Sequence, residues 1–200
     1  FTNNTSNNNG GAINNHYGTS IVNTSTFVGN SAVMGGAINS NYDGAVLNAT
    51  SCIFTGNSAT SATFGGGAIR NYNGTSTIVN SNFTNNVALN GGAIYNLGNY
   101  NANLGNLTLT NCTFTSNNAN TYGGAIENYY GILTSTNSTF TNNCASAGGS
   151  IHNQYGQGTI NNCTFTDNIA LNGGGGAIAN HEALLIVNTS TFNGNNATAS

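Results

Sequence analysis

The sequence of 200 residues is almost without charge: it has one Arg, no Lys and four acidic residues, and charged residues make up 2% of it. Typical domains carry about 25%. A single cation cannot neutralise a run of phosphates, so we expect no nucleic-acid partner, and the same lack removes attraction to anionic lipid. No run approaches the ~18 apolar residues of a membrane-spanning helix, so we predict no direct membrane insertion of this segment.

Polar but uncharged residues are abundant instead. The chain has 43 Asn, 28 Gly and 27 Thr, and its formal net charge is −3. Chains made soluble by amides and hydroxyls are more typical of the outside of cells, so we predict an extracellular, cell-surface location. The sequence starts at Phe1 without a Met and stops within a repeating pattern, so we expect residues 1–200 to be one repeat segment of a longer surface protein.

Two motifs alternate along the whole chain. The first is Phe-x-x-Asn, and its members are Phe1/Asn4, Phe27/Asn30, Phe54/Asn57, Phe83/Asn86, Phe114/Asn117, Phe140/Asn143, Phe165/Asn168 and Phe192/Asn195. The second is Gly-Gly-Ala-Ile, represented by Gly36, Gly92 and Gly124 and by Ile13, Ile38, Ile69, Ile94, Ile126, Ile151 and Ile178. A short aliphatic run precedes most of the Phe motifs. These regular positions are the predicted structural residues of the repeat.

The spacing of the motifs predicts the fold. Successive Phe residues of the motif lie 25 to 31 positions apart, and each interval holds three short β-like segments bounded by Gly or Asn. Three strands per repeat, repeated in order, are typical of a parallel β-helix in which each repeat forms one coil. We therefore predict an all-β, single-stranded parallel β-helix, a pectin-lyase-like solenoid of about seven to eight coils, right-handed by the general rule for parallel crossovers.

The residue types fit stacked coils. Phe and Ile would each form a column inside the stack, because one coil cannot bury its own apolar residues but neighbouring coils can. Asn would tolerate left-handed backbone at the strand ends, and stacked Asn side chains can bond to one another along the axis. Paired Gly residues would permit corners that a Cβ would block.

The interleaved motifs resemble the repeats of the polymorphic outer-membrane proteins of chlamydiae, and the Asn/Thr-rich composition is similar to that of adhesin-like surface proteins of methanogenic archaea. The resemblance covers essentially the whole chain. It implies a right-handed β-helix displayed on a cell surface and used for attachment. The positions it carries over, Gly-Gly-Ala-Ile and Phe-x-x-Asn, are architectural.

The four Cys residues do not predict disulfides. Cys52, Cys112 and Cys163 each lie two residues before a Phe, so they should face the interior beside it. They fall in alternate coils, ~9.6 Å apart axially at the strand spacing of a sheet, whereas disulfide Cα atoms approach within ~7 Å. Cys144 lies in another column, and no zinc-ligand spacing is present. We expect free thiols, no metal and no cofactor.

The residues directly after the motif Ile form a column that should point outward. We expect it to be a solvated face, formed by Asn14, Asn39, Arg70, Tyr95, Glu127, His152 and Ala179. Glu127 and His152 are neighbours in it, which leaves an acid–base pair as an alternative. The other acids, Asp43, Asp167 and Glu182, fall in different coils, and we predict that the chain is not an enzyme.

Two outward surfaces are candidates for contact with a partner. The first is an aromatic ridge after the Ile motif, suited to sugar or protein contact or to packing of the turn, formed by Tyr17, Tyr42, Tyr72, Tyr129, Tyr130 and Tyr155. The second is a Thr-x-Thr array beside Phe that resembles an ice-binding face, formed by Thr113, Thr115, Thr139, Thr141, Thr164 and Thr166.

These observations predict a structural and adhesive role, as a stalk or fibre segment of a large cell-surface protein. Weak contacts repeated along a rod add up to firm attachment. The expected partners are a carbohydrate or protein on another cell surface, or further copies of the chain. The alternatives are a filament or sheath subunit built by end-to-end stacking, a polysaccharide-active enzyme and an ice-binding protein.

Overall fold

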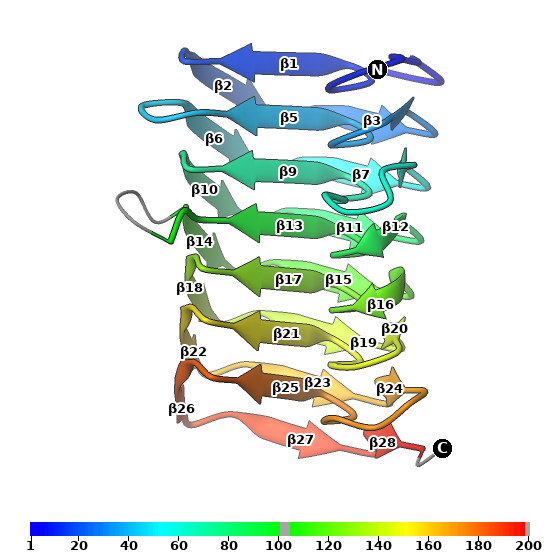
Figure 1. Ribbon diagram of the computed structural model, residues 1–200, viewed down its shortest axis with the longest axis vertical. Coiled ribbons are helices and arrows are strands. Elements are labelled where there is room, and N and C mark those ends of the chain that lie inside the picture. Colours follow the sequence, from blue (N-terminus) through cyan, green and yellow to red (C-terminus); the bar gives the residue numbers. More distant parts are fainter. Residues whose placement is uncertain (101–104, 199–200) are drawn as a thin grey trace.

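The computed structural model describes residues 1–100 and 105–198, and in it the chain winds as a right-handed β-solenoid from the N-terminus at one end to the C-terminus at the other (Figure 1). The strands form four parallel sheets of seven strands each, one strand per coil in every sheet. We name them the Ile, aliphatic, Phe and short sheets. The predicted all-β parallel solenoid is therefore confirmed.

The Ile sheet and the aliphatic sheet meet at one edge of each coil. The Ile sheet contains β1 (Ile13–His16), β5 (Ile38–Asn41), β9 (Ile69–Tyr72), β13 (Ile94–Leu97), β17 (Ile126–Tyr129), β21 (Ile151–Gln154) and β25 (Ile178–His181). The aliphatic sheet contains β2 (Thr19–Asn23), β6 (Val46–Thr50), β10 (Thr75–Val79), β14 (Asn106–Thr110), β18 (Ile132–Thr136), β22 (Gln157–Asn161) and β26 (Leu184–Asn188).

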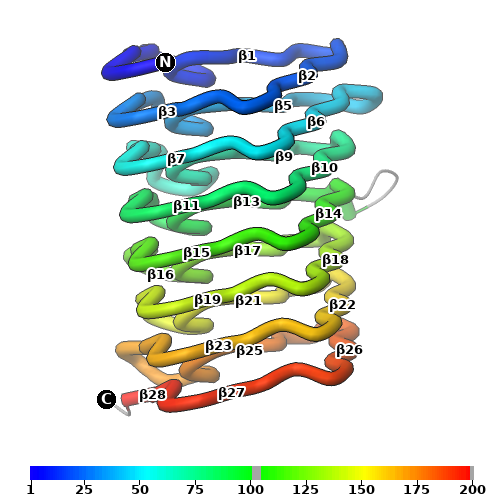
Figure 2. The backbone as a smooth tube through the Cα atoms, turned by 180° about the vertical axis from the view of Figure 1, so that it is seen from behind, coloured from blue at the N-terminus to red at the C-terminus, as the bar shows by residue number. Residues whose placement is uncertain are grey.

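The Phe sheet and the short sheet complete each coil. Figure 2 views the solenoid from the side opposite to Figure 1, with the Phe strands in front. The Phe sheet contains β3 (Thr26–Val28), β7 (Ile53–Thr55), β11 (Asn82–Thr84), β15 (Thr113–Thr115), β19 (Thr139–Thr141), β23 (Thr164–Thr166) and β27 (Thr191–Asn193). The short sheet contains β4 (Ser31–Ala32), β8 (Ser58–Ala59), β12 (Val87–Asn90), β16 (Asn118–Tyr122), β20 (Cys144–Ala145), β24 (Ile169–Ala170) and β28 (Asn196–Ala197).

The short sheet corrects the expectation of three strands per repeat, because each complete coil has four. Its strands follow the motif Asn, and several are only two residues long, such as β4 and β20. Two residues are too few to show an alternating pattern in sequence. They pair only because the coils above and below hold equivalent segments in register, as Ala32 does with Ala59.

Phe rings form a continuous stack through the core. Phe27 pairs with Phe54 in register, and the same holds from coil to coil along the Phe sheet. Successive ring centroids lie 4.7–4.8 Å apart with interplanar angles of 2–6°. That distance is the spacing between adjacent strands. Six of the rings, from Phe27 to Phe165, are fully buried, and burying each of them stabilises the fold by roughly 1.5–3 kcal/mol, a gain available only to stacked coils.

The motif Asn residues form a second ladder, as predicted. The Nδ2 group of Asn86 donates to Oδ1 of Asn117 at 2.9 Å, and Asn117 donates to Asn143 at 3.0 Å. The same oxygen of Asn117 accepts from the backbone N–H of Asn86, and Nδ2 of Asn117 also donates to the carbonyl of Phe83. These amides are fully buried, so each satisfies its hydrogen bonds by bonding to its equivalents.

The ladder continues in both directions from these three residues. Asn57 donates from Nδ2 to Oδ1 of Asn86 at 3.0 Å and to the carbonyl of Phe27 at 3.1 Å. Asn168 donates to Oδ1 of Asn195 at 2.7 Å and to the carbonyl of Phe140 at 3.0 Å. Each rung therefore ties an Asn both to the next coil and to the backbone of the preceding one.

The expectation that the motif Asn itself takes left-handed backbone was wrong. Positive φ belongs to the residue before it, which is Gly56, Asn85, Ser116 or Asp167 in four of the coils, with φ of 62°, 56°, 54° and 53°. Positive φ is absent from the six fully buried motif residues, Asn30, Asn57, Asn86, Asn117, Asn143 and Asn168. The physical reason for Asn is its side chain, because the ladder needs an amide that both donates and accepts, which Gly or Ser cannot supply.

The Gly pair turns the corner between the short sheet and the Ile sheet. Gly123 has φ of 60°, and Gly124 lies directly against the next coil. A Cβ on Gly124 would meet the carbonyl oxygen of Gly149 and the backbone of Cys144. Gly36 and Gly92 occupy the equivalent place in their coils, so the expected role of the pair is confirmed.

The four Cys residues are free thiols, as predicted. Cys52, Cys112 and Cys163 are buried beside the Phe stack, and each Sγ lies within hydrogen-bond distance of backbone carbonyls. Cys144 is half-buried in the short sheet. Burial raises the pKa of Cys112 and Cys144, which favours the protonated thiol over the more reactive thiolate.

Replacing Asn117 by Ala should destabilise the fold strongly. The change leaves the Asn86 amide groups, the Phe83 carbonyl and Asn143 Oδ1 short of a partner in the core. We expect a loss of about 3 kcal/mol or more in the free energy of unfolding, measured by urea denaturation. The exposed neighbour Asn118→Ala is the control and should stay within about 0.5 kcal/mol. Equal effects of the two changes would contradict the ladder's role.

Gly124→Ala should lower the free energy of unfolding by about 2–3 kcal/mol, because the added methyl group collides with rigid backbone of the next coil. The matched control is Gly56→Asn. Gly56 has positive φ, but a Cβ there meets nothing within 4 Å, and Asn85 holds the equivalent position in the next coil. The free energy of unfolding of this control should lie within about 0.5 kcal/mol of the wild-type value. A harmless Gly124→Ala in thermal melts would refute the close packing.

Candidate functional site

The outer face of the Ile sheet holds chemically varied side chains, and those of its middle coils are largely buried. Residues one and three positions after the motif Ile point away from the core, because side chains alternate along a strand. The expectation of a solvated face at the first of these positions was wrong. The buried members, with their exposed fractions, are Asn39 (0%), Arg70 (5%), Tyr95 (3%), Glu127 (1%) and His152 (5%).

Aromatic side chains from the short sheet and from the segments that follow it partly cover this face. Phe64 lies in the link between β8 and β9, and its ring centroid is 6.4 Å from that of Tyr95. Tyr122, at the end of β16, stacks on His152 with centroids 4.5 Å apart. Sequence reasoning missed both residues. One signal was present, since Phe64 is the one Phe of nine outside the Phe-x-x-Asn motif.

Glu127 and His152 meet on this covered face. They are register partners on β17 and β21, and His152 Nδ1 lies 2.9 Å from Glu127 Oε2. Burial raises the pKa of Glu127, while the hydrogen bond and charge of His152 act in the opposite direction. Tyr95 is the neighbour on the other side, and burial together with Glu127 raises its pKa. Glu127 and His152 can therefore share a proton between the carboxyl group of Glu127 and the imidazole of His152.

Arg70 is buried on the same face without an acidic partner in the described residues. Its Nη1 donates to Oδ1 of Asn39 at 3.1 Å and to Oδ1 of Asn41 at 3.3 Å, and Nε has no hydrogen-bond partner. The guanidinium lies 4.8 Å from the centre of the Tyr72 ring and 5.9 Å from that of Phe64. Burial lowers its pKa, an effect that nearby tyrosines oppose.

The aromatic contacts compensate only part of the cost of burying this charge. A cation–π contact contributes about 0.5–2 kcal/mol. Removing a charged group from water costs several kcal/mol. Arg70 is therefore a buried cation with unused hydrogen-bonding capacity.

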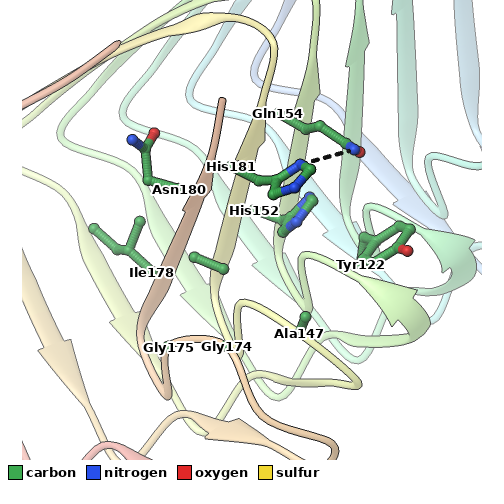
Figure 3. Close-up of a pocket in the computed structure, with 10 residues that line it drawn as sticks. Tyr122, Ala147, His152, Gln154, Gly174, Gly175, Ile178, Asn180 and His181 are labelled. Atoms are coloured by element: carbon green, nitrogen blue, oxygen red, sulfur yellow. Dashed lines mark hydrogen bonds between the residues drawn. The ribbon is translucent and has the colours of Figure 1, made fainter. Parts of the chain in front are cut away.

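Cavities open along the covered face on both sides of these residues. The first, which we call the arginine pocket, has a volume of about 440 Å³ and is lined by Met34, Phe64, Arg70, Tyr72, Leu97, Gly98, Asn99 and Tyr100. A second, of about 300 Å³, lies between Phe64 and Tyr122 and reaches Glu127. A third, of about 460 Å³, lies beside His152 and His181 (Figure 3), where Gln154 Nε2 and His181 Nδ1 are 3.2 Å apart.

The tyrosine ridge is present in two parts. Tyr17 and Tyr42 stack with centroids 5.0 Å apart, and Tyr130 and Tyr155 stack at 4.9 Å, all four at left-handed turns. In the coils between them, Asn73 and Gly98 take this position. Tyr72 and Tyr129 belong instead to the ends of β9 and β17, where their rings contact the ridge edge-on.

The remaining candidate residues stay apart. Asp43, Asp167 and Glu182 lie at separate turns, and Glu182 is 3.8 Å from exposed His181.

The Thr-x-Thr residues are in register on the outer face of the Phe sheet, as Thr139 is with Thr113 and Thr164. In residues 1–100 and 105–198, no three His, Cys, Asp or Glu side chains are grouped to hold a metal ion. Over the same residues, no helix is long and apolar enough to cross a membrane.

These features define a β-solenoid with a regular core and one covered, chemically varied face. The model of the Chlamydia polymorphic membrane protein (Chlamydia_PMP) repeat matches residues 80–97, 111–129 and 162–181. Each match runs from the Phe sheet through the short sheet to the Ile sheet of the next coil. The predicted resemblance to this repeat is thus confirmed. Searches of curated proteins and of solved structures found no significant match.

Glu127→Gln should remove a pH dependence of stability. Because burial raises the folded pKa of Glu127 above its ordinary 4.5, the stabilising protonated form is fully present below about pH 4.5 and is lost as pH rises through the folded pKa. The Tm of the wild type should therefore fall relative to the Tm of the variant as the pH is raised above about 4.5. Each kcal/mol lost from the free energy of unfolding lowers the Tm by about 2–4 °C. Exposed Asp167→Asn is the control and should follow the wild type. Parallel Tm profiles for wild type and Glu127→Gln would contradict the assignment.

Proposed function

We propose that this solenoid is a structural and adhesive segment of an extracellular cell-surface protein, without catalytic activity of its own. The observation that carries the proposal is the match of three segments of the chain to the Chlamydia polymorphic membrane protein repeat. The name of that family places its repeats in membrane proteins. A rod of the same repeats is suited to holding a binding surface away from the cell.

The arrangement of hydrogen bonds supports a mechanical role. The Phe stack and the Asn ladder continue from coil to coil, so bending the rod would separate rings and break buried amide bonds together. Every sheet is parallel and continuous over its seven strands. A continuous stack of this kind is suited to serve as a stiff rod.

The tyrosine ridge supports the adhesive part of the proposal. Tyr17 is well exposed and stacks on Tyr42, and the Tyr130–Tyr155 pair repeats the arrangement further along the same edge. Tyrosine presents an apolar ring with a polar tip, which suits contact with sugars and protein surfaces. Two such pairs on one rigid edge can bind a repetitive surface at two points.

Beads coated with the chain should attach to a cell monolayer, and the variant with Tyr17, Tyr42, Tyr130 and Tyr155 replaced by Ser should attach at least about tenfold less. The loss follows from multivalency, since losing both contact points removes the avidity as well as the single contacts. The matched control replaces Thr113, Thr139 and Thr164 by Ser on the Phe sheet and should attach like the wild type.

Immunogold labelling of intact cells of the source organism is the second measurement. We expect label on surface projections, removed by brief protease treatment of whole cells. Intact cells without label, with label only in sections of the cell interior or only in the medium, would overturn the proposal, as would equal attachment of wild-type and Ser-substituted beads.

A further inference from the structure

The chain's one basic side chain occupies an unusual place. Arg70 is buried on the covered face, and among the described residues no carboxylate lies within ion-pair distance of it. Its Nη1 donates hydrogen bonds to two Asn amide oxygens, while Nε has no partner. A fixed guanidinium with unused N–H groups is suited to binding an anionic oxygen group.

The arginine pocket gives that anion a place to sit. Its volume of about 440 Å³ falls within the range of ligand-binding pockets, roughly 300–1,000 Å³. Arg70 forms part of its wall, and the rings of Phe64, Tyr72 and Tyr100 form much of the rest. The pocket lies toward the middle of the solenoid, beside β9 and β13, which contribute Arg70, Tyr72 and Leu97 to its lining.

The lining selects for a ring-shaped polar ligand. Aromatic faces pack against the apolar face of a sugar ring, and the tyrosine hydroxyls and nearby amides can bond to hydroxyls at its edge. Four acidic residues and one basic residue give the chain a formal charge of −3. No general positive field therefore attracts anions, and any preference for an acidic ligand must come from Arg70 itself.

We propose that the arginine pocket binds one carboxylate-bearing sugar unit, such as a uronic acid residue of an acidic glycan, with its carboxylate on Arg70 and its ring against Tyr72 and Phe64. This inference rests on the proposed adhesive function for its biological setting and names a ligand class for it. The pocket adjoins the tyrosine ridge, because Tyr72 contacts Tyr42 with ring centroids 5.8 Å apart, but neither of the stacked pairs Tyr17–Tyr42 and Tyr130–Tyr155 is part of the pocket lining.

The test is a calorimetric and NMR titration of the whole chain with methyl β-glucuronide, methyl β-glucoside and glucose 6-sulfate. Glucuronide should bind at 1:1 and at least about tenfold more tightly than neutral glucoside, with shifts of the backbone amides of Arg70, Tyr72 and Leu97. Arg70→Gln should weaken glucuronide binding at least about tenfold, so that glucuronide and glucoside then bind alike. Asn118→Ala, on the short sheet and outside the pocket lining, should bind like the wild type.

A second variant guards against misfolding of Arg70→Gln. Tyr72→Leu keeps the guanidinium and an apolar wall but removes the ring, and it should weaken both glucuronide and glucoside severalfold. Wild-type affinity in either folded variant would overturn the proposal. Equal binding of glucose 6-sulfate would overturn the choice of carboxylate, and equal binding of N-acetylglutamate amide would overturn the choice of sugar.

The two proposals fail separately. If the wild-type chain does not bind glucuronide but the coated beads attach, the sugar site in the arginine pocket is rejected and the tyrosine ridge remains the proposed adhesive surface. Glucuronide binding without attachment of the beads would reject the adhesive function and leave a sugar site whose role lies elsewhere.

Discussion

The spacing between adjacent strands governs the whole molecule. Because each coil lies directly on the next at this spacing, most interior side chains touch their own equivalents from the neighbouring coils, as the Phe rings do at 4.7–4.8 Å. Only residues that pack well against copies of themselves can be repeated this way: a flat ring, an aliphatic side chain, an amide that both donates and accepts, or a Gly with no side chain. A charged residue repeated in register would face its own charge, which is destabilising. The near absence of charge follows from this constraint.

On the covered face, register neighbours are not copies of one another. Asn39, Arg70 and Tyr95 are register neighbours of entirely different chemistry. Phe64 lies over Arg70 and Tyr95, and Tyr122 stacks on His152 further along the face. A regular core thus supports an irregular surface. The outer positions of the Ile sheet can vary because the regular contacts inside the solenoid carry the stability, and the unusual side chains gather on this face.

Periodicity explains what could be predicted before the structure was known. The Phe and Ile columns, the Asn ladder and the free thiols all depend on contacts between equivalent residues, so counting positions was sufficient. The two-residue β4 and β20 were missed because their pairing exists only in the stack. The burial of Glu127 and His152 was missed for a different reason. It depends on how links of variable length fold back over a sheet, which no repeat pattern encodes, although the isolated Phe64 marked the place.

The Asn ladder also gives the rod a direction. At every step the earlier Asn donates and the later one accepts, from Asn4 through Asn30 to Asn195. Hydrogen bonds linked in one sense polarise one another. The column is therefore a one-way line of aligned dipoles along the axis, and another solenoid could extend it only in the same orientation, since a reversed one would oppose like groups.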